Sequence, residues 1–379
     1  MENHTLPLEL TREILLRLPV RSVLRFKRVC KSWHALISSP QFAISHYDLA
    51  ASPSHRLLIK SKDFSVQSID IDSRLFKPSR AVHFLCLPPP PPRPSDDSHY
   101  KYELLGSCRG LVLLWYQGDL ILWNPSTGAH KRFPNIEGDD DSDSPEEILY
   151  AFVYDTSTAE YCFILVDLEE FEYNESESDE RKAEILIFSF KTASCVPCKS
   201  IYFPYKYIGE KFSAGALFSG AIHWLVFTED ENFPVIIAFD MIQKSLSDIP
   251  LFDHFTTEKY NIYSFGVMGE CLSVCCKVKG CASAEIWMMK EYKVRSSWTK
   301  CAVIPIRGFL KDWFCPVCIT KDGKIFGSNI GGRLEKRNHK GELLEFLNYG
   351  GGGELYCLNL QSAVYRESLL SPSSEDDQQ

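Results

Sequence analysis

Residues 6–42 read LPLELTREILLRLPVRSVLRFKRVCKSWHALISSPQF, a short segment with large apolar residues at helical spacing. A segment of about 40 residues is near the lower limit for a domain that folds alone without disulfides, metal or a partner. Its predicted helices also fall short of the roughly 12–15 residues needed for marginal stability in isolation. The apolar surface must therefore be covered by the rest of the chain or by another protein, and spacing alone leaves both possibilities open.

Three helices are predicted within this segment. The first opens at Leu6-Pro7, because proline is tolerated in a first turn, and ends before Pro19, because proline cannot continue a helix. Leu10, Ile14 and Leu18 recur every four residues and form one apolar stripe. The second predicted helix covers residues 21–25 and the third covers residues 29–37, with Ser38, Ser39 and Pro40 ending it.

Composition indicates a soluble protein with a strand-rich body. The chain has 379 residues, enough for a small helical domain and one larger domain, and its aromatic share of 13% favours strands. The net charge of −9 argues against binding to nucleic acid, which needs a basic surface. Much of the acidity is local, in runs that we expect to be solvated loops: residues 137–147, residues 167–180 and a disordered acidic tail at residues 371–379.

The chain carries no sign of secretion or membrane insertion. Charged residues interrupt the first twenty positions, so no signal peptide is predicted, and no run approaches the ~18 apolar residues of a membrane span. The 14 cysteines stand mostly singly in strand-like runs, which indicates reduced, buried thiols. We therefore expect a cytoplasmic or nuclear protein.

Beyond a joint at Ser52–Ser54 the pattern changes from helical to strand-like. Strands are predicted at residues 56–60 and 65–71, and the prolines at 88–92 predict a stiff polyproline II loop. From Tyr102 a strand-turn-strand phrase repeats, and aligning the strand before each turn places Phe190, Phe239, Trp287 and Leu334 at spacings of 49, 48 and 47. Trp123 precedes Phe190 by a longer interval, and the position 48 residues before Trp123 is Leu75, which is next to Phe76.

A period of about 50 residues with several short strands per unit is typical of a kelch-like propeller blade. The sequence therefore predicts an all-β propeller of six blades, with seven as the alternative, after a small all-α domain. The strands expected near residues 355–360 and 363–369 would complete the blade that begins near Arg56 and would join the two ends of the propeller.

The order of residues in the N-terminal segment resembles the plant F-box. The resemblance rests on Leu6-Pro7, Glu13-Ile14-Leu15, Leu18-Pro19-Val20, Val29-Cys30-Lys31-Ser32-Trp33 and Ile37-Ser38-Ser39-Pro40. It implies a helical domain that docks on a Skp-type adaptor held by cullin and RING subunits of a ubiquitin ligase. The residues that the resemblance assigns to adaptor binding are Leu6, Pro7, Leu10, Ile14, Leu15, Leu18, Pro19, Val20, Leu24, Phe26, Val29, Trp33 and Ile37.

Phrases between about residues 100 and 346 resemble the plant F-box-associated domain. They are Ser107-Cys108-Arg109-Gly110-Leu111, Leu122-Trp123-Asn124-Pro125-Ser126-Thr127, Gly220-Ala221-Ile222-His223-Trp224-Leu225, residues 285–292 and Ser297-Trp298-Thr299-Lys300. Many relatives have Asn where Arg109 stands. In that family the domain is regarded as the part that selects targets for ubiquitination, but the target-binding residues are unknown from sequence.

Other chemistry has weak support. Cys195/Cys198 and Cys315/Cys318 have zinc-knuckle spacing, yet the pairs lie about 117 residues apart, so we favour ordinary thiols over a metal site. The glycines at 350–353 lack the residues of a phosphate-binding loop, and His223 in its apolar strand is interpreted as a satisfied core histidine. We expect no cofactor and no catalytic residue.

These observations favour an F-box domain at residues 1–48 and a propeller at residues 49–370. The expected function is that of a non-catalytic substrate-recognition subunit of an SCF-type ubiquitin ligase. Two alternatives stay open: a propeller enzyme or carbohydrate-binding protein with a helical cap, and an adaptor-bound scaffold that acts outside ubiquitination.

Overall fold

The computed structural model describes the greater part of the chain. The described residues are 7–49, 55–60, 66–75, 82–88, 102–116, 118–134, 148–168, 182–206, 212–228, 232–306, 313–329, 332–348 and 362–372. Several predicted features lie outside them: the joint at 52–54, Phe76, most of the proline run, the acidic runs apart from residues 167–168, most of the tail, the strand near 355–360 and the glycine run. Residues 167–168 end a strand instead of starting the predicted loop.

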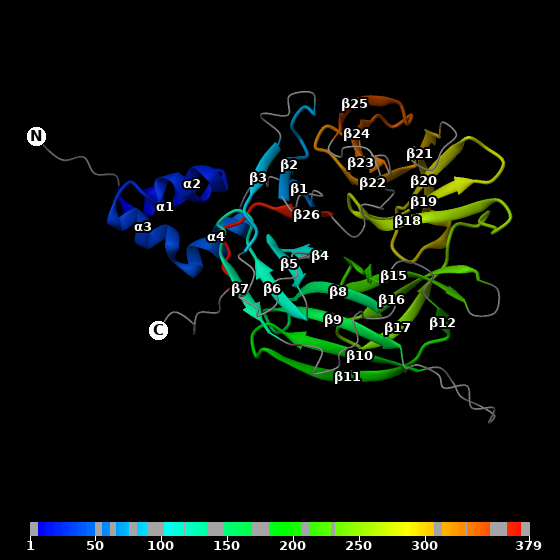
Figure 1. Ribbon diagram of the computed structural model, residues 1–379, viewed down its shortest axis with the longest axis horizontal. Helices are drawn as coiled ribbons and strands as arrows, with labels where there is room; N and C mark the ends of the chain where they lie inside the picture. The colour runs from blue at the N-terminus through cyan, green and yellow to red at the C-terminus, as the bar shows by residue number, and fades with distance from the viewer. Residues whose placement is uncertain are drawn as a thin grey trace, which may run out of the picture. The chain divides into compact units, whose positions relative to one another are not determined.

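Four short helices open the chain (Figure 1): α1 (Leu8–Leu16), α2 (Val20–Phe26), α3 (Lys31–Ser38) and α4 (Pro40–Leu49). The first three match the predicted helices, although α3 begins two residues later than expected. Sequence reasoning missed α4 because Pro40 was interpreted only as a stop. The side-chain oxygen of Ser39 accepts a hydrogen bond from the backbone N–H of Phe42 at 3.2 Å. Ser39 is thus an N-cap and Pro40 occupies the first helical position, where proline is favoured.

Most of the remaining described residues form six mainly antiparallel sheets, the blades of a β-propeller, which confirms the prediction of six rather than seven. The first blade has the order β26-β1-β2-β3. Its strands are β26 (Ser362–Arg366), β1 (His55–Lys60), β2 (Val66–Asp70) and β3 (Val82–Leu85). The second blade consists of β4 (Glu103–Cys108), β5 (Leu111–Tyr116), β6 (Asp119–Trp123) and β7 (His130–Phe133).

The other four blades follow in chain order. The third comprises β8 (Ile148–Asp155), β9 (Glu160–Leu168), β10 (Lys182–Ser189) and β11 (Ser194–Tyr202), with β13 (Phe212–Ala214) parallel to β8. The fourth comprises β12 (Tyr205–Lys206), β14 (Ala216–Phe218), β15 (Ala221–Thr228), β16 (Pro234–Asp240) and β17 (Ser245–Ile249). The fifth comprises β18 (Tyr260–Met268), β19 (Cys271–Val278), β20 (Ser283–Met289) and β21 (Trp298–Pro305). The 3₁₀ turn η1 (Arg295–Ser297) lies directly before β21. The sixth comprises β22 (Phe314–Ile319), β23 (Ile325–Asn329), β24 (Arg333–Arg337) and β25 (Leu343–Asn348).

The sequence repeat corresponds to the third strand of each blade. Trp123, Phe239, Trp287 and Leu334 lie in β6, β16, β20 and β24, and Phe190 directly follows β10. The step back to Leu75 is wrong, because the third strand of the first blade is β2, which ends at Asp70. An irregular segment follows β2, so the period of 48 does not extend into the first blade.

The described chain divides into two compact units. One holds the four helices, the first two blades and residues 362–372, and the other holds residues 72–75 and the remaining four blades. Pairing of β26 with β1 at Val364 and Leu57 confirms that the end of the chain completes the first blade. Buried apolar side chains such as Leu58, Tyr365 and Trp123 pack between the first two blades. No described helix is long and apolar enough to cross a membrane.

Candidate adaptor-docking face and its attachment

The helical module, residues 7–49, has a core of its own. Leu15 and Leu16 of α1, Val23 of α2, Ile37 of α3 and Phe42 of α4 pack together, each no more than 3% exposed. Leu18, Phe26, Trp33 and Leu36 are half-buried against this cluster. The helices therefore stabilise one another with one side of each, at roughly 1.5–3 kcal/mol per buried large side chain.

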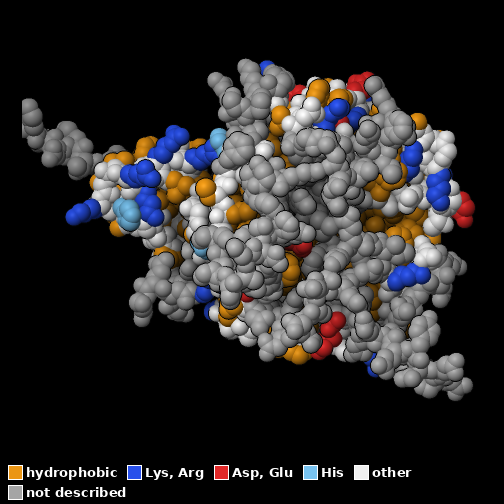
Figure 2. Space-filling model, viewed as in Figure 1, with side chains coloured by type: hydrophobic (Ala, Val, Ile, Leu, Met, Phe, Trp, Pro, Cys, Tyr) orange, Lys and Arg blue, Asp and Glu red, His pale blue; other side chains and the backbone are white. Residues whose placement is uncertain are grey.

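The module also leaves apolar residues in solvent. Leu8, Leu10 and Ile14 of α1 and Val29 in the turn before α3 are each 52–61% exposed. With Ile44 and Leu49 of α4 they make six of the fifteen exposed large apolar residues in the described chain, all within 43 residues. Figure 2 shows orange side chains among the basic ones on this part of the molecule. This concentration makes the helical module the candidate interaction surface of the described chain.

The residues predicted for adaptor binding divide between these two surfaces. Leu6 lies outside the described residues. Leu15 and Ile37 belong to the helical core, and Val20 is also buried, so in this structure the three do not present a surface. The remaining predicted residues are exposed or half-buried and are available to a partner: Pro7, Leu10, Ile14, Leu18, Pro19, Leu24, Phe26, Val29 and Trp33.

Ion pairs fix α2 to the first blade. The Arg21 guanidinium donates to the Glu367 carboxylate at 3.0 Å and lies 2.7 Å from Nε2 of His83. Glu367 also lies 3.7 Å from the guanidinium of Arg56, whose side chain is 3% exposed. Burial, followed by the charges of Arg21 and Arg56, lowers the pKa of His83, so its neutral ring can accept the bond from Arg21.

A stack of two arginines on a tyrosine fixes α4. The guanidinium carbon of Arg366 lies 3.9 Å from the ring centroid of Tyr47, and that of Arg109 lies 5.2 Å from it. Arg366 also donates to the carbonyl oxygen of Tyr47, and Arg109 donates to Asp48 at 3.3 Å. Arginine over an aromatic face adds to the attachment because the ring quadrupole attracts the cation. The helices are therefore attached to the first two blades by charged contacts from both α2 and α4.

The family phrase around Arg109 forms a tight turn. Arg109 and Gly110 are the two residues between β4 and β5, and both have positive φ, +44° and +80°. This is the geometry that favours Asn-Gly, because Asn tolerates the left-handed region better than other residues with side chains. The Asn found in many relatives thus suits the turn. In this chain Arg109 occupies that strained position and contacts Tyr47 and Asp48.

A second family phrase holds the end of the chain. We call residues 366–370 the strap. The buried Asn124 amide donates to the carbonyl oxygens of Ser368 at 3.2 Å and Leu370 at 2.7 Å, while its own oxygen accepts from Ser126 N at 2.8 Å. Leu369 of the strap packs against the helical core. The strap therefore joins the second blade to the helical module.

The role of Asn124 in holding the strap could not be predicted from the sequence, because it depends on a contact between residues 244 positions apart.

The His223 phrase is also structural. His223 is fully buried in β15, with Nδ1 3.1 Å from the Ala216 carbonyl oxygen and Nε2 2.8 Å from the Tyr292 hydroxyl. Burial lowers its pKa, so the ring stays neutral. Both ring nitrogens thus have partners, which agrees with a satisfied core histidine. Next to it, Trp224 donates to the carbonyl oxygen of Tyr150 at 3.0 Å within the core.

The described cysteines carry no metal-site geometry. All thirteen of them are free thiols, among them the Cys195/Cys198 and Cys315/Cys318 pairs. No group of three or more His, Cys, Asp or Glu among the described residues could hold a metal ion.

Comparison with known proteins agrees with this architecture. Residues 4–45 match the F-box domain, and residues 57–326, more than two thirds of the chain, match the F-box associated beta propeller domain. An F-box/kelch-repeat protein of Arabidopsis thaliana is 29% identical over 329 residues, covering 85% of this chain and 84% of the relative. The F-box protein CPR1 of the same plant is 25% identical over 336 residues, covering 84% and 78%. The chain therefore belongs to the plant F-box proteins that carry an F-box associated β-propeller domain.

Proposed function

We propose that this protein is a substrate-recognition subunit of an SCF-type ubiquitin ligase, acting in the cytoplasm or nucleus. Its helical module binds a Skp-family adaptor, and through it the cullin and RING subunits. Its propeller binds a target protein. The observation that supports this most directly is the exposed apolar face of α1 and the turn before α3, on a module whose core is already complete without it.

The proposed mechanism is proximity rather than catalysis. An adaptor bound to the helices and a target bound to the propeller are parts of one assembly, so the target's lysines reach a high effective concentration near the conjugating enzyme. Such a mechanism needs no nucleophile or cofactor in this chain. The contacts of Arg21 and Tyr47 support it, because they hold the helical module on the blades instead of leaving it on a loose linker.

The first experiment is binding of the full chain to a recombinant Skp-family adaptor. Leu10→Asp combined with Ile14→Asp should weaken binding by at least a hundredfold, since interface anchors each contribute about 2 kcal/mol or more. Leu18 and Trp33 are less suitable for this test because aspartate there would also disturb the helical core. Ile242→Asp changes an 84% exposed isoleucine in a blade turn and is the matched control.

Retained binding in the Leu10/Ile14 double variant, or equal loss in the control, would contradict the proposed docking face. A second experiment compares the wild type and the double variant by proximity labelling with the proteasome inhibited. Targets should accumulate near both, but their ubiquitination should require the intact face. Labelling without ubiquitination would favour a scaffold that acts outside ubiquitination. A hit in a glycan array or activity screen of the full chain would favour a propeller enzyme or carbohydrate-binding protein.

A further inference from the structure

Three cations of the helical module have no side-chain partner among the described residues. Lys27, Arg28 and Lys31 form no ion pair with any carboxylate of the described residues. Two other cations of the module differ from them, since Arg12 donates to Ser45 and Arg21 donates to Glu367. Their charges are therefore available to a ligand outside the module.

Lys31 is also poorly placed for helix stability. It is the first residue of α3, a helix whose first turn contains no acidic residue. A cation at a helix N-terminus is disfavoured by the positive end of the helix dipole. The local fold therefore gains nothing from this charge, and its presence adds to an unopposed positive potential at the turn between α2 and α3.

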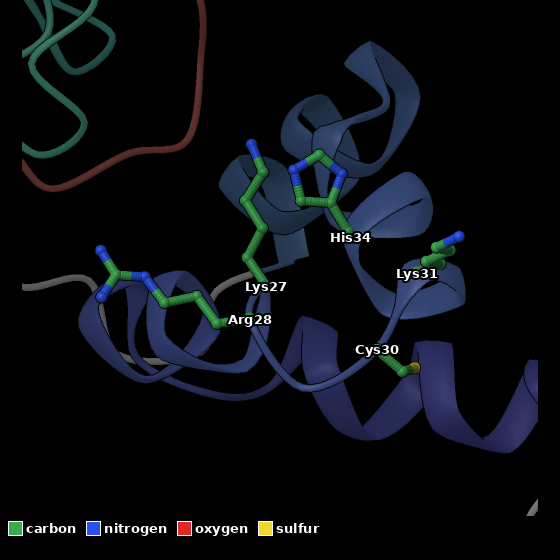
Figure 3. A pocket seen from close by; sticks show the side chains of 5 residues that line it. All are labelled: Lys27, Arg28, Cys30, Lys31 and His34. Atoms are coloured by element: carbon green, nitrogen blue, oxygen red, sulfur yellow. The ribbon is translucent and has the colours of Figure 1, made fainter.

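These side chains surround one open hollow of about 410 Å³, lined by Lys27, Arg28, Cys30, Lys31 and His34. Figure 3 shows Lys27 and His34 projecting on the same side, while Arg28 and Lys31 extend in opposite directions. We call this hollow the basic pocket. It combines several hydrogen-bond donors that carry positive charge with wide access from solvent, which suits an anionic chain segment better than an enclosed small molecule.

An apolar residue lies at the edge of the basic pocket. Val29 stands in the sequence between two lining residues, Arg28 and Cys30, and is 61% exposed. A partner that covers Val29 also comes close to the cations of the basic pocket and displaces water from them. Such a partner must therefore offset their positive charge. Residues 7–49 contain seven Lys and Arg against three Asp and Glu, whereas the whole chain has a net charge of −9. The positive charge is thus concentrated in the helical module.

We propose that the basic pocket receives an acidic segment of the Skp-family adaptor, one that places carboxylates beside an apolar residue. This inference rests on the proposed function and adds the chemistry of the partner. Contacts of this kind accelerate encounter and fix the orientation of a complex, because complementary charges steer the approach of the two surfaces. The apolar face supplies the affinity of the complex, whereas the basic pocket increases the association rate and fixes the orientation of the adaptor.

The test measures binding of the full chain to a recombinant Skp-family adaptor at 50, 150 and 500 mM NaCl. Wild-type affinity should fall by roughly tenfold or more over this range, since salt screens exposed charges. Lys27→Glu combined with Lys31→Glu should weaken binding at least thirtyfold at 50 mM NaCl and should flatten the salt dependence. Lys279→Glu combined with Lys340→Glu makes the same charge change on exposed blade turns and should alter affinity less than threefold.

Circular dichroism of both double variants establishes that they are folded before binding is compared. Equal effects of the two variants, or wild-type affinity that is unchanged by salt, would overturn the inference while leaving the proposed function intact. Absence of any wild-type binding to the adaptor would instead overturn the proposed function, and the inference with it. Binding that is lost in the Leu10/Ile14 variant but unchanged in the Lys27/Lys31 variant would show that the interface is apolar only.

Discussion

Replacement of Asn124 by alanine should release the strap. The Asn124 side chain is fully buried, and its amide group is the donor for two carbonyl oxygens, those of Ser368 and Leu370. Alanine cannot donate a hydrogen bond, so both oxygens lose this partner. The strap would then be held on the second blade by the weaker contacts of Ser368 with Ser126 and Gly110, while the sheet hydrogen bonds of β26 remain.

The expected cost follows from the number of bonds lost. A buried hydrogen bond contributes about 0.5–1.5 kcal/mol, and a buried polar group left without a partner costs about 1–3 kcal/mol. Two carbonyl oxygens without their donor therefore amount to roughly 3 kcal/mol. Loss of the turn contact to Ser126 N adds about 1 kcal/mol. Three kcal/mol corresponds to roughly a hundredfold change in a local opening equilibrium.

Asn338 provides the matched control. It follows the third strand of the sixth blade as Asn124 follows that of the second, and its side-chain oxygen likewise accepts from the turn, from Lys340 N at 2.9 Å. Its amide donates to the exposed side chain of Glu342 rather than to buried carbonyls. Asn338→Ala should therefore cost only about 1 kcal/mol.

Hydrogen exchange measured by mass spectrometry is the assay, on peptides that separate residues 367–372 from β26. Exchange there should be about a hundredfold faster in Asn124→Ala and unchanged in Asn338→Ala. Guanidinium denaturation followed by tryptophan fluorescence should show the larger loss of stability for Asn124→Ala. Similar protection of the strap in both variants would refute the reasoning that Asn124 holds it.

Three further predictions concern the same unit. Gly110→Ala should destabilise the protein by at least 2 kcal/mol more than Gly128→Ala. Both glycines have φ near +80°, but only at Gly110 would the new Cβ lie 2.4 Å from another side chain, that of Ser368. Equal unfolding midpoints of the two variants would contradict this prediction. Glu367→Gln should cost about 2–3 kcal/mol in chemical denaturation, because it removes a charge partner from the buried Arg56, and a loss below 1 kcal/mol would argue against the pair. Burial lowers the pKa of His46 below its ordinary value of 6.5. As the pH falls through about 6.5, the unfolded chain therefore takes up more protons than the folded chain, and folding stability decreases. His46→Gln should reduce this pH dependence of stability between pH 7.5 and 5.5, and an unaltered profile would count against the role of His46.

Much of the fold was predictable because local patterns dominate it. The stop at Pro19, the strands at residues 56–60 and 65–71 and the repeat from Trp123 to Leu334 all depend on neighbours close in sequence. The fourth helix was predictable in principle, since Ser39-Pro40 carries both an N-cap and a first-position proline.

The division of the helical residues into core and surface was less accessible. Leu10 and Leu15 both belong to the apolar pattern of α1, yet one is 53% exposed and the other 1%. Periodicity identifies an apolar stripe but does not say which part of it another helix covers. That depends on how α4 packs, and α4 was missed. The strap was inaccessible for a related reason, because Asn124 and Ser368 meet only after the first blade has been completed.

The pairing of β26 with β1 has a consequence for how the protein is made. Residues 7–49 are synthesised more than three hundred residues before the strand that finishes the first sheet. A chain that stalls or is cleaved before residue 362 would carry a helical module without the partner strand of β1. Under the proposed function, such a fragment would keep the adaptor-binding helices beside an incomplete propeller, and the open edge of β1 would make it prone to aggregation. Premature termination late in the message is therefore expected to be more harmful than loss of the message.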